Sequence, residues 1–233
     1  MGKFAGIADP EELWERWLTC KWVRSFESGR CSELAFAAGV VEDWQLRMSP
    51  ADYLEEFRSW PKGVLPGAEA LVIEVKSRVP VSCFSNTNVL HWQYAQTWPL
   101  MGLFDHVFLS FQMGMLKPDH DAFEHVASAL RVPRGRILFL DDNQLHIDAA
   151  LELRFSASRV AGIEPSAARR LRLERLAIFN QRCGKPPAGF PQRGDRPGRG
   201  PGRAKTYPHG TCFFSPSKKA TLACELPRSW NLT

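Results

Sequence analysis

The sequence lacks the residue patterns of metal fingers and disulfide-bonded scaffolds. Its six cysteines form no C-x-x-C pair, and its six histidines are equally dispersed. This spacing argues against a zinc site and against a compact disulfide framework. We therefore expect plain thiols at all six positions, which are Cys20, Cys31, Cys83, Cys183, Cys212 and Cys224.

Long apolar runs are also missing. No stretch approaches the roughly 18 apolar residues that a membrane-spanning helix needs, and the first residues, Met1 to Ala5, do not lead into the apolar segment of a signal peptide. We expect no membrane contact and a cytoplasmic location. With 44% hydrophobic and 24% charged residues, the 233-residue chain has the composition of an ordinary globular protein.

The net charge of +5 is unevenly distributed. Residues 180–233 hold ten Lys/Arg and two Asp/Glu, together with seven of the 17 glycines and eight of the 17 prolines. We predict that 180–233 is a basic, largely disordered tail, at least over 184–205. Arginines among glycines support salt-dependent contacts with nucleic acid. The tail has few aromatic residues near its arginines, so we do not expect nucleic acid to be a partner.

The first region, residues 1–62, reads as a set of helices. Asp9 is a candidate N-cap, with Pro10 at the first helical position and Glu12 three residues after the cap. Ser32 predicts a second helix that ends at Gly39. Ser49 predicts a third, which ends before Pro61. We expect a small helical unit here.

The second region, residues 63–179, alternates helices with short apolar runs. Such alternation predicts a Rossmann-type α/β fold, with a parallel sheet, helices on both faces and ligands beyond the carboxyl ends of the strands. The predicted strands are 79–84, 106–109, 137–140 and a weaker one at 155–160. The predicted helices are 66–78, 90–100, 118–130, one through 149–153, and 165–179.

Two polar clusters near predicted strand ends suit a phosphate group. Ser85 and Asn86 follow a strand and offer a hydroxyl and backbone N–H groups at the start of a helix. Lys117 can place a compact positive charge against a phosphoryl group or a carboxylate. Simpler interpretations remain open, because Ser and Asn often cap helices and Lys117 stands in a loop before Pro118.

A third cluster suits a metal ion. Asp141 and Asp142 directly follow the run Ile-Leu-Phe-Leu, where two adjacent carboxylates resist burial unless a cation or hydrogen-bond donors compensate them. Mg²⁺ prefers oxygen ligands and usually takes one or two protein carboxylates. The alternative is that Asp142 or Asn143 only caps the next helix.

The three clusters occur in an order that resembles motifs II, III and IV of the haloacid dehalogenase (HAD) superfamily. The matching segments are Ser85-Asn86-Thr87-Asn88, Gly114-Met115-Leu116-Lys117-Pro118-Asp119 and Phe139-Leu140-Asp141-Asp142-Asn143. The resemblance covers roughly residues 10–165. It is greatest to the subfamily I proteins with a small helical cap, whose cap matches 10–62.

This resemblance implies a HAD-like hydrolase, with small phosphorylated metabolites as substrates and Mg²⁺ as cofactor. By the same resemblance, Ser85 and Asn86 would bind the phosphoryl group. Lys117 would stabilise the nucleophile and the transferring phosphate. Asp142, with Asp141 beside it, would hold Mg²⁺ or position its ligands, and the sequence does not specify which carboxylate touches the metal.

The nucleophile of that family does not stand out in the sequence. Its motif I is an apolar strand that ends in Asp-x-Asp, where the first Asp attacks phosphorus and the second is the general acid and base. The one upstream candidate is Asp9, which the helix-start pattern explains better. In the family this strand lies between those ending at Ser85 and Asp141, so we predict a sheet without its central strand. The chain would then be truncated, degenerate or dependent on a borrowed strand.

Three functions remain open at this point. The first is a magnesium-dependent phosphatase whose activity depends on the missing nucleophile. The second is a catalytically inactive phosphate-binding or interaction protein. The third is a hydrolase of the 2-haloacid dehalogenase type, which needs no metal and is therefore less consistent with the Asp141-Asp142 pair. Neither the substrate nor the oligomeric state follows from the sequence.

Overall fold

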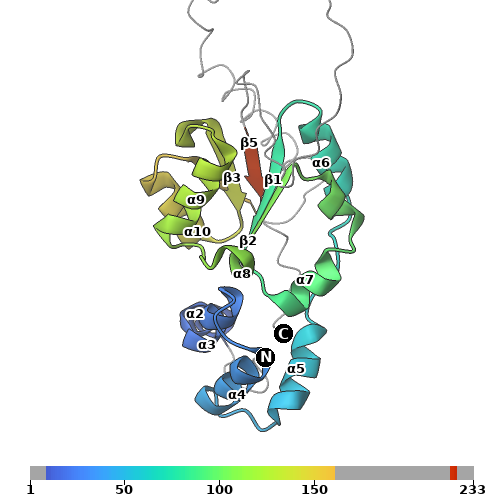
Figure 1. The fold of residues 1–233 in the computed structure, drawn as a ribbon, viewed down its shortest axis with the longest axis vertical. Coiled ribbons are helices and arrows are strands. Elements are labelled where there is room, and N and C mark those ends of the chain that lie inside the picture. The colour runs from blue at the N-terminus through green and yellow to red at the C-terminus, as the bar shows by residue number, and fades with distance from the viewer. Residues whose placement is uncertain (1–8, 161–220, 225–233) are drawn as a thin grey trace, which may run out of the picture.

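The computed structural model describes residues 9–160 and 221–224. Four helices of the first region lie together at one end of the molecule, and the sheet lies at the other (Figure 1). We call these helices and their connections, residues 9–62, the cap region. They are α2 (Pro10–Thr19), α3 (Lys21–Glu27), α4 (Glu33–Asp43) and α5 (Pro50–Arg58).

The cap region has an aromatic core of its own. Trp17, Phe36 and Phe57 are each at most 4% exposed, and the ring of Phe36 stacks on that of Phe26 with centroids 4.4 Å apart. Such pairs add to the free energy gained from burial alone. These rings form one cluster with Leu90 of the next region. The cap region is therefore packed as a small domain that also contacts the sheet unit.

Serine N-caps begin two of the cap helices, as predicted. The Ser32 Oγ accepts a hydrogen bond from the Ala35 N–H, and the Ser49 Oγ accepts one from the Asp52 N–H. The predicted end of α4 at Gly39 was wrong, because the helix continues to Asp43. A Cβ atom at position 39 would meet the indole ring of Trp22. Gly39 therefore permits close packing of α3 against α4.

The sheet is parallel, with the strand order β2-β1-β5-β3-β4. The strands are β1 (Val81–Ser85), β2 (His106–Leu109), β3 (Ile137–Asp141), β4 (Ser156–Arg159) and β5 (Thr221–Cys224). The first four were predicted to within two residues at each end. Their carboxyl ends point toward the cap region (Figure 1).

Helices cover both faces of the sheet. The helices are α6 (Ala68–Lys76), α7 (Val89–Ala95), α8 (Ser110–Met113), α9 (His120–Leu130) and α10 (Gln144–Glu152), with two 3₁₀ turns, Pro99–Leu103 and Arg134–Arg136. On β3, Ile137 and Phe139 pack toward α9 and α10, while Leu138 and Leu140 pack toward α6. Burial on both faces is typical of a parallel sheet. The predicted α/β fold is confirmed.

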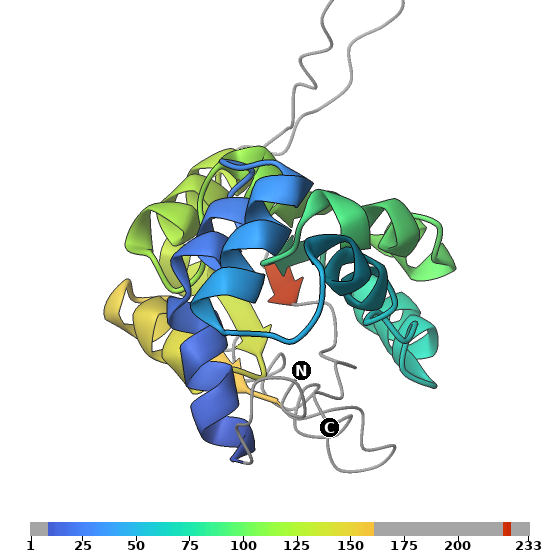
Figure 2. The same cartoon turned by 90° about the horizontal axis from the view of Figure 1, so that it is seen from below.

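The predicted gap in the sheet is filled. Strand β5 lies between β1 and β3 and runs parallel to both (Figure 1). It comes from the region predicted to be a tail, 180–233, whose other residues lie outside the described ones, as does the predicted helix 165–179. The strand in this central place is not the expected first strand, because it comes after β4 in the sequence. Seen from the cap side, the arrowhead of β5 lies near the middle of the molecule (Figure 2).

Across 9–160 and 221–224, no helix has the length and apolar character needed to cross a bilayer.

Candidate functional site

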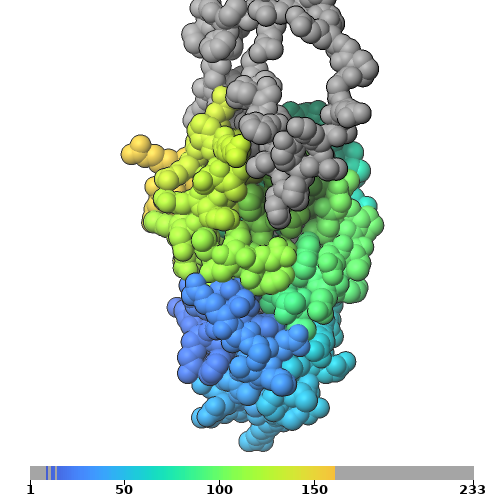
Figure 3. Space-filling view, in the orientation of Figure 1, coloured from blue at the N-terminus to red at the C-terminus, as the bar shows by residue number. Residues whose placement is uncertain are grey.

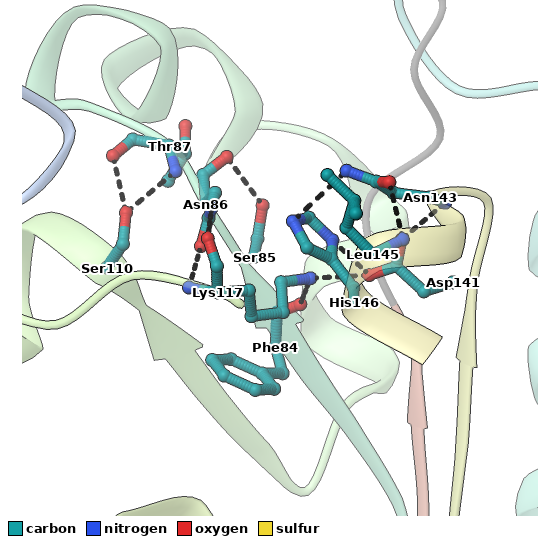
Figure 4. Close-up of polar contacts among 10 residues, drawn as sticks. All are labelled: Phe84, Ser85, Asn86, Thr87, Ser110, Lys117, Asp141, Asn143, Leu145 and His146. Atoms are coloured by element: carbon teal, nitrogen blue, oxygen red, sulfur yellow. Dashed lines mark hydrogen bonds and ion pairs between the residues drawn. The ribbon is translucent and has the colours of Figure 1, made fainter. Parts of the chain in front are cut away.

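Three of the predicted site residues meet at the carboxyl edge of the sheet (Figure 4). Ser85 ends β1, Asp141 ends β3, and Lys117 comes from the loop between α8 and α9. All three are buried, with exposed fractions of 2%, 1% and 1%. The structure therefore brings together residues that are up to 56 positions apart in the sequence.

Lys117 joins β1 to β3 through its ammonium group. The Lys117 Nζ donates to the Asp141 Oδ2 at 2.8 Å and to the Phe84 carbonyl oxygen at 2.9 Å. It also lies 4.9 Å from the ring centroid of Phe84 and 5.4 Å from that of Phe139. Burying two charges carries a desolvation cost that only close pairing and further hydrogen bonds offset. Lys117 thus stands against a carboxylate, one of the two partners predicted for it.

The side chain of Asn86 fixes the backbone of the lysine loop. Its Nδ2 donates to the Lys117 carbonyl oxygen at 2.8 Å, and its Oδ1 accepts from the Lys117 N–H at 2.9 Å. The amide of Asn86 therefore holds Lys117 in place. This pair of bonds was not predicted, because the partners are 31 residues apart.

Ser110 is a site residue that the sequence did not reveal. Its hydroxyl accepts from the Thr87 N–H at 2.9 Å and donates to the Thr87 carbonyl oxygen at 2.8 Å. Both residues are at least 96% buried. The available signal was its place directly after the run His-Val-Phe-Leu, as Ser85 follows its own strand. Ser110 holds the loop after β1 in a fixed shape.

Both carboxylate oxygens of Asp141 are engaged. The Oδ1 accepts from the Asn143 N–H at 2.8 Å, and the Oδ2 accepts from Lys117 and lies 3.0 Å from the His146 Nδ1. His146 is 1% exposed, and its Nε2 lies 3.3 Å from the Asn143 Nδ2. This arrangement suits a ring protonated at Nδ1, which donates to Asp141 and accepts from Asn143. The contact between His146 and Asp141 was not predicted from the sequence.

Asp142 is half-buried beside this network. Its carbonyl oxygen accepts from the Arg159 Nε at 2.9 Å. Asn143 provides the N-cap of α10, because its Oδ1 accepts from the Leu145 N–H at 3.0 Å. Of the two residues that the alternative interpretation named as N-cap, Asn143 is the one that fills this position.

In the described part of the chain, no group of three or more His, Cys, Asp or Glu side chains is arranged to hold a metal ion. Mg²⁺ commonly binds through one or two carboxylates and completes its shell with water and substrate oxygens. The donor set at Asp141 and Asp142 therefore has the chemistry that Mg²⁺ uses, and it does not suit a metal that needs several protein ligands.

Asp9 lies at the start of α2 in the cap region. Its carbonyl oxygen accepts from the Leu13 N–H at 3.0 Å, the first hydrogen bond of that helix. This position agrees with the helix-start interpretation of Asp9.

The cap region contacts the loop that carries Lys117. Arg24 forms an ion pair with Asp119 at 2.7 Å, and the Arg30 Nη2 donates to the Gly114 carbonyl oxygen at 2.8 Å. A cavity of about 370 Å³ lies at this junction, with Lys21, Arg24 and Arg30 on the cap side. In the space-filling view the cap region lies directly against the core (Figure 3).

The sequence model of haloacid dehalogenase-like hydrolases matches residues 14–153, more than half of the chain. The chain belongs to this family. The matched range contains Ser85, Lys117, Asp141 and Asp142, and it ends before β5. The predicted membership in the HAD family is confirmed.

Solved HAD structures share the fold at low sequence identity. A HAD family enzyme from Bacteroides thetaiotaomicron, in complex with magnesium and inorganic phosphate, is 20% identical, with a TM-score of 0.56 over 71% of this chain and 87% of its own. A predicted HAD-like hydrolase from Porphyromonas gingivalis is 24% identical, with a TM-score of 0.58 over 75% and 87%. The L-2-haloacid dehalogenase RSc1362 is 20% identical, with a TM-score of 0.54 over 72% and 84%.

Proposed function

We propose that this HAD-family chain binds the phosphate group of a small phosphorylated metabolite together with Mg²⁺, without turning it over. The observation that carries the proposal is the buried Lys117–Asp141 pair, at 2.8 Å, between the ends of β1 and β3. A buried ion pair is weak evidence for stability but is common where a site needs a fixed charge.

The phosphate would lie at the carboxyl edge of the sheet, near Ser85. The Ser85 hydroxyl and the backbone N–H of Asn86 are the proposed donors, because the side chain of Asn86 already holds the lysine loop. Lys117 supplies the positive charge. This assignment keeps Ser85, Asn86 and Lys117 in the roles that the sequence suggested.

Asp142 is the proposed magnesium ligand, and Asp141 is its positioning neighbour. Asp141 uses both oxygens for Lys117, Asn143 and His146, and Asp142 directly follows it after β3. Bound Mg²⁺ would neutralise part of the phosphate charge. The Bacteroides thetaiotaomicron enzyme with magnesium and inorganic phosphate supports this pairing of ligands in the family.

The proposed lack of turnover rests on the carboxylates of the described residues. An aspartyl-phosphate needs a carboxylate that is able to attack phosphorus. Among the described residues, β5 contributes Thr-Leu-Ala-Cys at the centre of the sheet, and Asp141 is committed to its own network. Phosphate binding is therefore better supported than phosphatase activity.

Calorimetric titration of the full chain with inorganic phosphate, with and without Mg²⁺, tests the proposal. We expect binding that Mg²⁺ strengthens, weaker Mg²⁺ dependence in Asp142→Asn, and an unchanged profile in Asp148→Asn, whose exposed carboxylate lies in α10. We also expect no hydrolysis of p-nitrophenyl phosphate. Absence of phosphate binding would refute the proposal, and hydrolysis that Asp142→Asn abolishes would replace it with a phosphatase.

Release of chloride from 2-chloropropionate distinguishes the dehalogenase alternative. We expect none, because the Asp141-Asp142 pair suits phosphate and metal better than a reaction that needs no metal. Chloride release without Mg²⁺ would favour the dehalogenase.

A further inference from the structure

The two halves of the site are joined by a strand from far along the chain. Within the described strands, β1 pairs with β2 and β5, β3 pairs with β4 and β5, and no ladder joins β1 to β3. Ser85 belongs to the first half and Asp141 to the second. Among the backbone ladders of the described strands, β5 is therefore the link between Ser85 and Asp141.

The space that β5 fills is lined by two buried strands. Val81 and Cys83 of β1 pair with Leu222 and Cys224, and Leu140 of β3 pairs with Cys224 from the other side. The side chains of 81–83 and 137–140 are at most 4% exposed. Without β5, the N–H and C=O groups of both strand edges would lose their ladder partners and apolar side chains would meet water.

The hydrogen bonds of Lys117 depend on the distance between β1 and β3. Neighbouring strands lie about 4.8 Å apart, so β1 and β3 are held about 9.6 Å apart with β5 between them. The Lys117 Nζ bonds to the Phe84 carbonyl oxygen on one side and to the Asp141 carboxylate on the other. If β5 left, the distance between β1 and β3 would change, and Lys117 Nζ would not keep both of these hydrogen bonds in their present geometry.

The covalent connection to β5 is remote. Residues 160–220 separate the end of β4 from Thr221. Among the described residues, β5 is positioned by its ladders with β1 and β3, and a separate molecule with the same sequence would make the same ladder contacts.

We propose that the space between β1 and β3 is a binding site for a short, extended, apolar segment that runs parallel to both strands. This chain's own Thr221–Cys224 fills it, and docking of this segment assembles the phosphate site. The role in assembly rests on the proposed function. The strand-binding site itself does not.

Two variants of the full chain test the docking. Ala223→Pro removes a ladder N–H in the middle of a central strand, where proline is excluded, while Ala223→Gly keeps the N–H and adds no volume. The first readout is the rate at which a thiol reagent labels the buried Cys83, mapped by mass spectrometry, with the half-buried Cys20 and Cys31 as internal references. The second is phosphate affinity.

We expect Ala223→Pro to label Cys83 at least about tenfold faster and to bind phosphate at least about tenfold more weakly than Ala223→Gly. A synthetic peptide of residues 217–228 should then protect Cys83 in Ala223→Pro and restore phosphate affinity. The same peptide with proline at position 223 should not. The protection of Cys83 by the peptide can be measured even if Ala223→Pro is largely unfolded without it.

Equal behaviour of the two variants, or no protection by saturating peptide, would overturn the proposal. If the unaltered chain binds no phosphate while the peptide still protects Cys83 in Ala223→Pro, the proposed function fails and the strand-binding site stands. The two ideas therefore fail separately.

Discussion

At the scale of single residues, the site is a network of buried polar groups with fixed partners. Lys117, Asp141 and His146 are each at least 98% buried and are joined by contacts of 2.8 and 3.0 Å. In such a network the loss of one partner costs more than the net contribution of the pair, because a charge is left buried.

Lys117→Met should reveal this asymmetry. The variant leaves the Asp141 carboxylate buried without its cation, and we expect the free energy of unfolding to fall by about 3–5 kcal/mol. Adding Asp141→Asn removes the stranded charge, so the double variant should recover at least about 1 kcal/mol. Urea unfolding measures both. Simple additivity of the two substitutions would show that the pair is not coupled.

His91 is a second buried residue with defined partners. Its Nε2 lies 2.8 Å from the Phe57 carbonyl oxygen in the cap region, and its Nδ1 lies 3.0 Å from the Asn88 Nδ2. Burial lowers the pKa of His91 from the usual 6.5 to about 4, although the hydrogen bond to Phe57 acts in the opposite direction. The neutral ring is therefore the form that the fold accepts.

Acid should weaken the fold through His91. Because the folded pKa is lower than the unfolded one, the unfolded chain binds more protons between pH 6.5 and about pH 4. We expect the free energy of unfolding to fall across this window, by on the order of 3 kcal/mol. Unfolding in urea at several pH values should show a smaller fall for His91→Gln. The exposed His125→Gln should keep the full fall.

At the scale of elements, α4 shows how packing overrides a local stop signal. Gly39 predicted a helix end, yet it lies inside α4 with the indole ring of Trp22 against it. A glycine in a helix interior costs about 0.5–1 kcal/mol relative to alanine. The close approach of α3 to α4 offsets that cost.

Gly39→Ala should therefore destabilise the protein, although alanine is the better helix former. We expect a loss of about 1–3 kcal/mol from the overlap with Trp22. Ala38→Gly, at an exposed neighbouring position of the same helix, should cost only about 0.5–1 kcal/mol. Thermal or urea unfolding measures both. Stabilisation by Gly39→Ala would contradict the packing argument.

The elements that the sequence predicted well depend on local chemistry. Ser32 and Ser49 cap their helices through bonds to residues three positions ahead, and such contacts can be read from spacing. Ser85 and Asp141 end apolar runs, so their place at the carboxyl edge of a parallel sheet followed from the α/β pattern.

The features that were not predicted from the sequence depend on partners that are distant in the sequence or on a particular turn. Strand β5 is the four-residue segment Thr-Leu-Ala-Cys in a Gly/Pro-rich region, and its pairing with β1 and β3 makes it a strand. The contact of His146 with Asp141 likewise arises from the turn between β3 and α10. Neither leaves a periodic pattern in the sequence.

At the scale of the whole molecule, the cap region is held against the core by a tight turn. Gly29 has φ +69°, and a Cβ atom there would meet the Phe111 carbonyl oxygen of α8. The flanking bonds from Arg24 to Asp119 and from Arg30 to Gly114 lie on either side of this contact in the sequence. The cap region thus rests on the backbone of the loop that carries the site lysine.

Gly29→Ala should weaken this docking. Gly63 is the matched control, because it also has a positive φ, +100°, but has no atom within 4 Å of the added Cβ position. Both variants carry backbone strain of roughly 1–2 kcal/mol. We expect Gly29→Ala to lose about 1–3 kcal/mol more from the steric overlap. Equal losses in urea unfolding would show that the contact with Phe111 relaxes freely.

The central position of β5 also affects how the protein folds during its synthesis. Residues 9–160 leave the ribosome well before Thr221, and at about 5–20 residues per second the delay is roughly 3–12 s. During that interval the facing edges of β1 and β3 are open, and open edges of apolar strands favour aggregation. A nascent chain that already contains residues 14–153, the range matched by the HAD family, therefore still exposes these edges to chaperones until β5 is synthesised.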